Sequence, residues 1–187
     1  MGQFCFEETF LNGLYVITPK IFSDNRGYFM EAFNQDDFRK NGLDVKFVQD
    51  NQSYSIKGVL RGIHFQKQNP QGKLVRVIKG EVFDVAVDLR KGSRTYGKWY
   101  RIVLSEYNKK QLYIPEGFGH AFLVLSDTAE VTYKCTQFYN CDDEGGIIWN
   151  DPHINIKWPL DRITTLILSD KDKKWGTLKD NDLIFNY

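Results

Sequence analysis

Two short stretches of the sequence bring together side chains that can accept or donate protons. The first contains Arg61, His64 and Lys73, and the second contains Tyr133 and Tyr139. An imidazole can act as a base near neutral pH, a phenol can donate a proton, and an ammonium group can stabilise developing negative charge. Together these side chains are the parts of an acid–base site.

The chain has three histidines, and each of them also admits a structural interpretation. His64 and His120 both lie close to glycines, in turn-rich surroundings where a hydrogen-bonded structural histidine is more common than a catalytic one. His153 follows Asn-Asp-Pro, which is a turn sequence, and we expect it at the surface. The neighbouring cations and phenols favour a catalytic role for His64.

A metal centre is an alternative, because many β-barrels with histidines hold a transition metal. Such a site needs three or more ligands, commonly a His-x-His pair with a carboxylate and another histidine. Gln66 stands two residues after His64, and no second histidine lies within several positions of it. We therefore expect neither a metal nor another cofactor.

Length and charge set the class of protein. The 187 residues, of which 42% are hydrophobic, are enough for one well-packed domain, so we expect a single domain over residues 1–187 that ends in a tail over 173–187. The formal net charge of +1 provides no general attraction for nucleic acid or an anionic membrane. An anionic ligand must therefore be held by a few local cations.

The cysteines and the N-terminus indicate the compartment. Cys5, Cys135 and Cys141 are odd in number and form no C-x-x-C pair, which argues against a disulfide framework. Glu7 and Glu8 stand where an export signal would need basic residues and an apolar run, and no apolar run is long enough to span a bilayer. We expect a soluble protein of the reducing cytoplasm.

Residues 46–158 have the composition of an antiparallel β protein. β-Branched and aromatic segments alternate there with Gly, Asn and Asp, and helices are expected to be minor. In 81–89 the residues Phe83, Val85, Val87 and Leu89 recur with a period of two, so we expect this face of the strand to meet the core. The predicted strands cover 73–78, 81–89, 99–104, 111–114, 121–125 and 130–139.

The connections complete this prediction. Lys79-Gly80 is read as a tight hairpin, and residues 115–119 as a hairpin or corner. A short helix is expected over 35–41, and a further turn after Ser169. The charged segment 170–182 is expected to be solvated. The regular spacing of short strands favours an all-β sandwich or barrel of jelly-roll type.

A long ordered series of motifs resembles the dTDP-4-dehydrorhamnose 3,5-epimerase family. The resemblance covers roughly residues 17–172 and implies a cupin-type jelly-roll β-barrel with a few short helices. Such an ordered series is more specific than any single motif. The matching segments are 51–53, 59–66, 71–75, 80–90, 115–122, 133–134, 149–152, 156–159 and 168–172.

The resemblance also implies a reaction, the epimerisation of dTDP-4-dehydro-6-deoxy-D-glucose at C3 and C5 through an enolate, with no cofactor. It makes His64 the base, Asp172 its carboxylate partner, Tyr133 the acid on the opposite ring face, and Lys73 the cation facing the enolate oxygen. Read without it, Asp172 could simply balance a short helix start after Ser169. Lys73 could be a solvated lysine and Tyr133 a core or interface residue.

The family's substrate contacts can be carried over in the same way. Tyr139 matches the residue that stacks on the thymine ring, although neighbouring Phe138 could serve if the register slips by one. The family's homodimers exchange N-terminal strands, so Arg26 and Glu31 are expected to reach the partner's pocket. The complete set of implied substrate-binding residues is Arg26, Glu31, Gln49, Asn51, Arg61, His120, Tyr139, Glu144 and Lys171.

Two other functions remain compatible with parts of this pattern. A relative that epimerises only C3 or only C5, in the biosynthesis of an antibiotic sugar, would use the same acid and base. A non-catalytic cupin that only holds a sugar nucleotide would not need His64, Asp172, Tyr133 and Lys73 together, which favours an enzyme.

Overall fold

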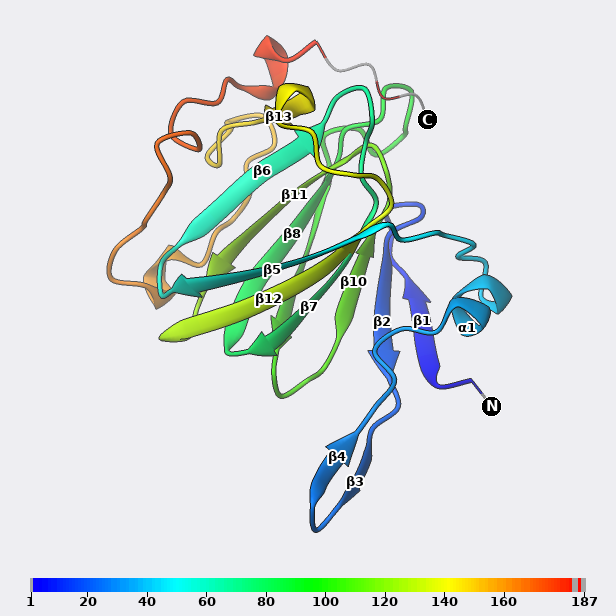
Figure 1. Ribbon diagram of the computed structural model, residues 1–187. Coiled ribbons are helices and arrows are strands. Elements are labelled where there is room, and N and C mark those ends of the chain that lie inside the picture. The colour runs from blue at the N-terminus through cyan, green and yellow to red at the C-terminus, as the bar shows by residue number, and fades with distance from the viewer. Residues whose placement is uncertain (1, 183–184, 186–187) are drawn as a thin grey trace.

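The computed structural model describes residues 2–182 and 185, and it consists mainly of two facing antiparallel sheets (Figure 1). The larger sheet has six strands, in the spatial order β1 (Phe4–Glu8), β2 (Tyr15–Pro19), β10 (Gln111–Ile114), β7 (Lys73–Lys79), β12 (Thr128–Cys135) and β5 (Gln49–Ile56). The smaller has five, in the order β13 (Glu144–Gly146), β6 (Leu60–Gln66), β11 (Phe118–Val124), β8 (Glu81–Asp88) and β9 (Trp99–Ser105).

The few helices are short. They are α1 (Gln35–Lys40) and three 3-10 turns, η1 (Cys141–Asp143), η2 (Leu160–Arg162) and η3 (Leu178–Asp180). The all-β fold class is therefore confirmed. Within residues 2–182 and 185, no helix is long and apolar enough to cross a lipid bilayer.

Apolar side chains fill the space between the two sheets. Val75 and Val131 of the larger sheet pack with Val82 and Phe122 of the smaller one, and all four are buried. A second cluster covers the opposite face of the smaller sheet, where the strand residues meet Ile147, Ile154, Ile156, Leu178 and Phe185 from later in the chain. The central strands β8 and β11 are thus buried on both faces, and almost every one of their residues is buried.

The predicted face of β8 does meet a core, but the opposite face of the strand is buried as well. Phe83 and Val85 point away from the larger sheet, into the cluster formed with the C-terminal segments. The face between the sheets carries Val82 and Ala86, and the two-residue period of a strand puts Asp84 on that same face. Asp84 is therefore a buried carboxylate in the interior of the sandwich.

The expected hairpin at Lys79-Gly80 was wrong. β7 pairs with β10 and β12, whereas β8 pairs with β11 and β9, so Gly80 turns the chain from one sheet into the other. Gly80 has φ of 78°, and a Cβ on it would overlap the Thr128 carbonyl oxygen and the Ser126 hydroxyl. Only glycine fits this corner without strain.

The other local predictions were closer. β10 has the predicted bounds, and β7 and β9 are each one residue longer than predicted. β11 begins at Phe118 rather than residue 121, and β12 ends at Cys135, which leaves Tyr139 in the following loop. Because β12 ends early, Tyr139 lies in a loop at the open end of the sandwich rather than in the sheet.

Both predicted capping sites are confirmed. The Asn34 side chain accepts hydrogen bonds from the backbone N–H groups of Asp36 and Asp37 at the start of α1. The backbone N–H of Asp172 donates to the Ser169 hydroxyl at 3.0 Å. The predicted tail 173–187 lies partly outside the described residues, and in its described part Leu178 is buried.

A small hairpin projects from the body of the molecule (Figure 1). It consists of β3 (Phe22–Asp24) and β4 (Gly27–Phe29), which pair only with each other. Its aromatic side chains are exposed, with Tyr28 at 55% and Phe29 at 66%. Apolar rings in such a position indicate a surface that another molecule covers.

Candidate active site

His64 and Asp172 form a hydrogen-bonded pair at one end of the sandwich. The imidazole Nε2 lies 2.5 Å from Asp172 Oδ1, although the two residues are 108 positions apart in sequence. The histidine comes from β6, on the face toward the larger sheet, and its side chain is 25% exposed, whereas the carboxylate is 2% exposed. The predicted pairing of these residues is what the structure contains.

The turn after Ser169 holds Asp172 in place. Burial alone would raise the pKa of this carboxyl group, but hydrogen bonds from His64, Ser169 and Trp175 outweigh it and lower the pKa. Asp172 is therefore ionised at neutral pH. A carboxylate on Nε2 keeps the proton on that nitrogen and leaves Nδ1 as the basic atom, and Nδ1 has no hydrogen-bond partner among the described residues.

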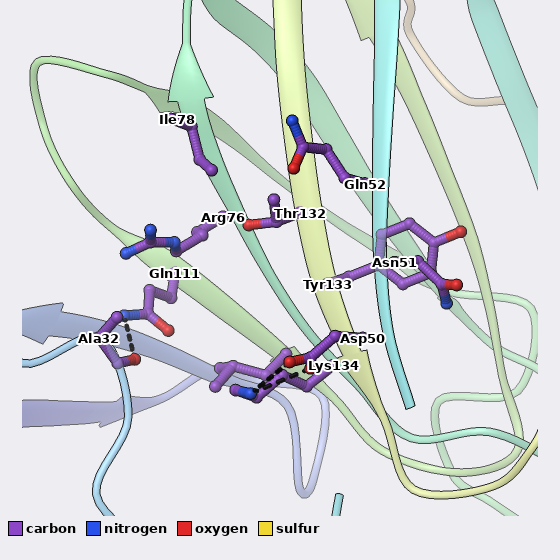
Figure 2. A pocket seen from close by; sticks show the side chains of 11 residues that line it. Ala32, Asp50, Asn51, Gln52, Arg76, Ile78, Gln111, Thr132, Tyr133 and Lys134 are labelled. Atoms are coloured by element: carbon purple, nitrogen blue, oxygen red, sulfur yellow. Dashed lines mark hydrogen bonds and ion pairs between the residues drawn. The ribbon is translucent and has the colours of Figure 1, made fainter. Parts of the chain in front are cut away.

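Tyr133 and Lys73 approach the same place from the larger sheet. His64, Tyr133 and Lys73 line one cavity of about 250 Å³, with the imidazole on one sheet and the phenol on the other. The Lys73 ammonium lies 5.8 Å from the centre of the Tyr133 ring. In Figure 2 the Tyr133 ring and Asn51 point to one side of the sheet, and Thr132 and Lys134 lie on the other.

Burial favours the neutral form of both groups, which suits the proton donor Tyr133 but opposes the charged form of Lys73. Removal from water lowers the pKa of Lys73, against the opposing influence of Cys135, Asp84 and Glu144. It raises the pKa of the Tyr133 phenol, so this hydroxyl is protonated at neutral pH and can serve as a donor. A partly desolvated ammonium also stabilises a nearby anion more strongly than one in bulk water does.

The mouth of the cavity is formed by a chain of polar contacts. The Tyr139 hydroxyl donates to Glu144 at 3.1 Å, and the same carboxylate accepts two contacts from Lys171 at 2.7 and 2.8 Å. The backbone N–H of Tyr139 donates to the Gln49 side chain at 2.9 Å. Of the predicted binding residues, Gln49, Asn51, Tyr139 and Glu144 line the cavity itself.

Arg61 and His120 lie beside the cavity rather than in its lining. Arg61 donates to the Ser55 hydroxyl at 3.1 Å. His120 pairs in register with His64 on the adjacent strand, and its Nε2 lies 3.0 Å from both oxygens of Asp84. His120 is thus one member of a second, buried histidine–carboxylate pair.

Arg26 and Glu31 are not brought to this cavity by their own chain. Arg26 lies in the projecting hairpin and pairs with Asp24 at 2.6 Å. Glu31 accepts a hydrogen bond from Asn34 at 2.9 Å, near the start of α1. A contribution from these two residues to catalysis would have to be made to another copy of the chain.

Three residues at the site were missed in the sequence. Asp84 was overlooked because only the opposite face of its strand was expected to be buried. Gln66 lines the cavity, and its side chain joins the loops on either side by contacts to Asn69 and Asn140. Trp175 donates from its indole nitrogen to Asp172 at 3.3 Å. The only signal for Trp175 was its position three residues after Asp172, on one side of the predicted turn.

The same region offers no metal centre. Within the described part of the chain, no group of three or more His, Cys, Asp or Glu side chains is arranged to hold an ion. His153 lies far along the chain, in an exposed turn, and its Nδ1 is 3.9 Å from Asp151. The cavity is lined by an imidazole, a phenol and an ammonium group, which are suited to proton transfer and to binding an anionic ligand.

Comparison with known proteins agrees with this geometry. The sequence profile described as dTDP-4-dehydrorhamnose 3,5-epimerase matches residues 8–180. The chain belongs to this family. Since epimerases are isomerases, the protein is an enzyme of that class.

Similar proteins match over nearly the full length. The epimerase of Methanothermobacter thermautotrophicus is 55% identical over 181 residues, which cover 97% of this chain and 98% of the relative. A solved epimerase from Legionella pneumophila, in complex with dTDP-4-keto-L-rhamnose, is 45% identical with a TM-score of 0.94 and covers 98% of each chain. A 3'-monoepimerase from Streptomyces bikiniensis, in complex with dTDP-quinovose, is 35% identical with a TM-score of 0.85 and covers 91% of this chain and 86% of its own.

Proposed function

We propose that this enzyme epimerises dTDP-4-dehydro-6-deoxy-D-glucose at C3 and C5 to dTDP-4-dehydro-L-rhamnose, with His64 and Tyr133 as the proton-transferring pair. One observation carries the proposal: His64 and Tyr133 come from facing sheets and line the same cavity. A hexose ring bound between them would have a base on one face and an acid on the other.

The chemistry follows from the ketone at C4 of the substrate. Protons on C3 and C5 are acidic because the carbanion formed by their removal is delocalised onto the ketone oxygen as an enolate. His64 Nδ1 takes the proton, and Asp172 stabilises the imidazolium that results. The Lys73 ammonium stabilises the enolate oxygen.

Inversion requires that the new proton arrive from the opposite face. The Tyr133 phenol gives its proton to the same carbon, which breaks the enolate and restores the ketone. The resulting phenolate and imidazolium return to their starting forms by proton exchange with water. Each inverted carbon therefore carries a hydrogen that comes from the enzyme and the solvent.

The mouth residues fit the nucleotide part of the substrate. Tyr139 offers an aromatic face for the thymine ring, and Arg61 and Lys171 offer cations for the diphosphate. In this structure Lys171 is paired with Glu144, so binding of a diphosphate would exchange one anionic partner of the lysine for another.

Solvent deuterium tests the reaction directly. The protein is incubated with dTDP-4-dehydro-6-deoxy-D-glucose in deuterated water, and the sugar is followed by proton NMR. We expect deuterium at both C3 and C5 together with the L-configured product. Exchange at one carbon would indicate a single-carbon epimerase, and no exchange with folded protein would refute the function.

We also propose that the active enzyme is a homodimer in which each projecting hairpin completes the partner's site. β5 is an edge strand, and the outer face of its sheet contains a depression of about 430 Å³ (Figure 2). The exposed rings of the hairpin, Phe22, Tyr28 and Phe29, supply apolar surface for a second copy. Arg26, between these strands, would then face the substrate in the partner.

Mixed dimers test this arrangement. Arg26→Ala and His64→Ala chains are each expected to have low activity alone. When they are mixed and allowed to exchange subunits, one site of each mixed dimer has both residues intact, and activity should recover to about a quarter of the unmodified level. A monomer in sedimentation analysis, or no recovery from a confirmed mixed dimer, would contradict the proposal.

A further inference from the structure

The indole of Trp175 is built into the His64–Asp172 pair. Its Nε1 donates to Asp172 Oδ1 at 3.3 Å, and this is the same oxygen that contacts His64 Nε2. The indole and imidazole rings meet edge to face, with centroids 6.4 Å apart and an interplanar angle of 68°. The tryptophan therefore contacts both members of the pair.

The backbone around the indole is shaped for it. Gly146 of β13 pairs in register with His64 of β6, and a Cβ on Gly146 would overlap the indole atoms Cδ2, Cε2 and Nε1. The next residue, Gly176, accepts a hydrogen bond from the backbone N–H of Ile148 at 2.9 Å. The ring thus lies flat on the strand beside the histidine, and its position is set by two separate backbone contacts.

We propose that Trp175 is a positioning residue of the active site, which orients the Asp172 carboxylate and shares its charge with the His64 imidazole. This inference rests on the proposed role of His64 as the base. Two donors on one oxygen restrict the rotation of the Asp172 carboxylate, so its lone pairs keep a fixed direction toward His64 Nε2. It also places less of its negative charge on the imidazole than an oxygen with a single donor.

Loss of the indole N–H should raise the pH at which the His64 imidazole loses its proton. Without it, more of the carboxylate charge acts on the imidazolium, so the protonated ring is held more strongly and the neutral base is present only at higher pH. The other titratable groups near the imidazole are the same in wild type and variant. They are Lys73 and Tyr133 on the facing sheet, Tyr139 and Glu144 at the cavity mouth, and His120 on β11.

Two matched variants separate this role from a general loss of aromatic packing. Trp175→Phe keeps a ring and removes the N–H that reaches Asp172. Trp158→Phe makes the same chemical change elsewhere, because Trp158 Nε1 donates to the Trp149 carbonyl at 2.8 Å. Gly146→Ala is a third variant, which leaves the N–H in place but displaces the indole.

The measurements are the pH profile of kcat/KM and an NMR titration of the His64 ring. The ring signals can be assigned because the chain has only three histidines. For Trp175→Phe and Gly146→Ala we expect a loss of about tenfold in kcat/KM at neutral pH, the low end of the effect of a hydrogen bond to a charged group, because the contact is long at 3.3 Å. The acidic limb and the His64 titration should both move to higher pH. Trp158→Phe should leave both unchanged.

The outcomes distinguish the inference from the function on which it rests. A Trp175→Phe titration that coincides with wild type, or a loss of activity with no movement of the acidic limb, overturns the positioning role. If the wild-type enzyme produces no deuterium exchange, the proposed function fails. The His64 titration then still decides whether the indole acts on the pair, because this readout needs no activity.

Discussion

The two histidine–carboxylate pairs lie on neighbouring strands of one sheet, yet they differ in their surroundings. The His64 side chain is 25% exposed and faces a cavity, whereas the His120 side chain is 7% exposed. Asp172 contacts its histidine through one oxygen, and Asp84 through both. The same two residue types therefore serve as an accessible base in one pair and as an internal support in the other.

The cause of the difference is where each carboxylate originates. Asp84 is in β8, two strands from β6 in the same sheet, and its position is set when the sheet forms. Asp172 comes from a surface turn that is brought to β6 by packing of the C-terminal segment. A pair assembled at the edge of the sandwich can be open to a substrate, and one assembled inside it cannot.

The largest effect is expected from removing the accessible base. His64→Ala should lower the rate of deuterium exchange by roughly 10²–10⁴-fold, the usual loss for a general base. His153→Ala is the control, because this exposed histidine lies outside the cavity, and it should have the wild-type rate. A near-normal rate in His64→Ala would remove the residue from its assigned role.

A smaller loss is expected from changing the partner of that base. Asp172→Asn keeps the shape of the side chain but removes the charge that stabilises the imidazolium, and kcat should fall by about 10- to 100-fold. Circular dichroism should show an unchanged fold. If kcat is retained, the carboxylate has only the structural role of balancing the turn that starts at Ser169.

Changing the internal pair of His120 and Asp84 should lower the stability of the fold. Asp84→Asn leaves the buried His120 with a weaker partner, and we expect a loss of about 1–3 kcal/mol in the free energy of unfolding. Urea unfolding measures this change, and Asp172→Asn, at the edge of the sandwich, should show a smaller one. Equal destabilisation by the two variants would erase the distinction between the pairs.

The smallest expected effect is the loss of folding stability in acid, to which the buried carboxylates Asp172 and Asp88 contribute. Hydrogen bonds to Asp172 outweigh its burial and lower its pKa, and those to Asp88 from Arg90, Ser93 and Thr95 do the same there. The folded-state pKa thus lies below the unfolded value of about 3.9. The contribution of these two carboxylates to the free energy of unfolding is present above pH of about 4, and it is lost as the pH falls through their pKa values in the folded state. Asp88→Asn should flatten the acid limb of stability measured by urea unfolding, and an unchanged limb would contradict this.

Local structure was largely predictable because it depends on neighbouring residues. The bounds of β10, the cap of α1 by Asn34 and the turn after Ser169 all follow from side-chain type and short-range hydrogen bonds. The inner face of β8 was not predictable in this way. The face toward the other sheet carries Asp84 and Asp88 beside Val82 and Ala86, so the two-residue period pointed only to the wholly apolar face with Phe83 and Val85.

The residues of the site likewise fall into those that the sequence indicated and one that only tertiary packing places there. Resemblance to the family pointed to His64, Tyr133, Lys73 and Asp172, and these four lie together in the structure. For Trp175 the sequence offered only its spacing from Asp172, and the place of its indole depends on the packing of the C-terminal segment against β13.

The sequence by itself determined the all-β class, the short capped helix and membership of the epimerase family. Only the tertiary structure decided that Gly80 joins two sheets and that Asp84 faces inward. The reason is physical. Turns and caps are set by contacts over a few residues, whereas faces, sheet partners and buried ion pairs are set by which distant segments bury their apolar surface together.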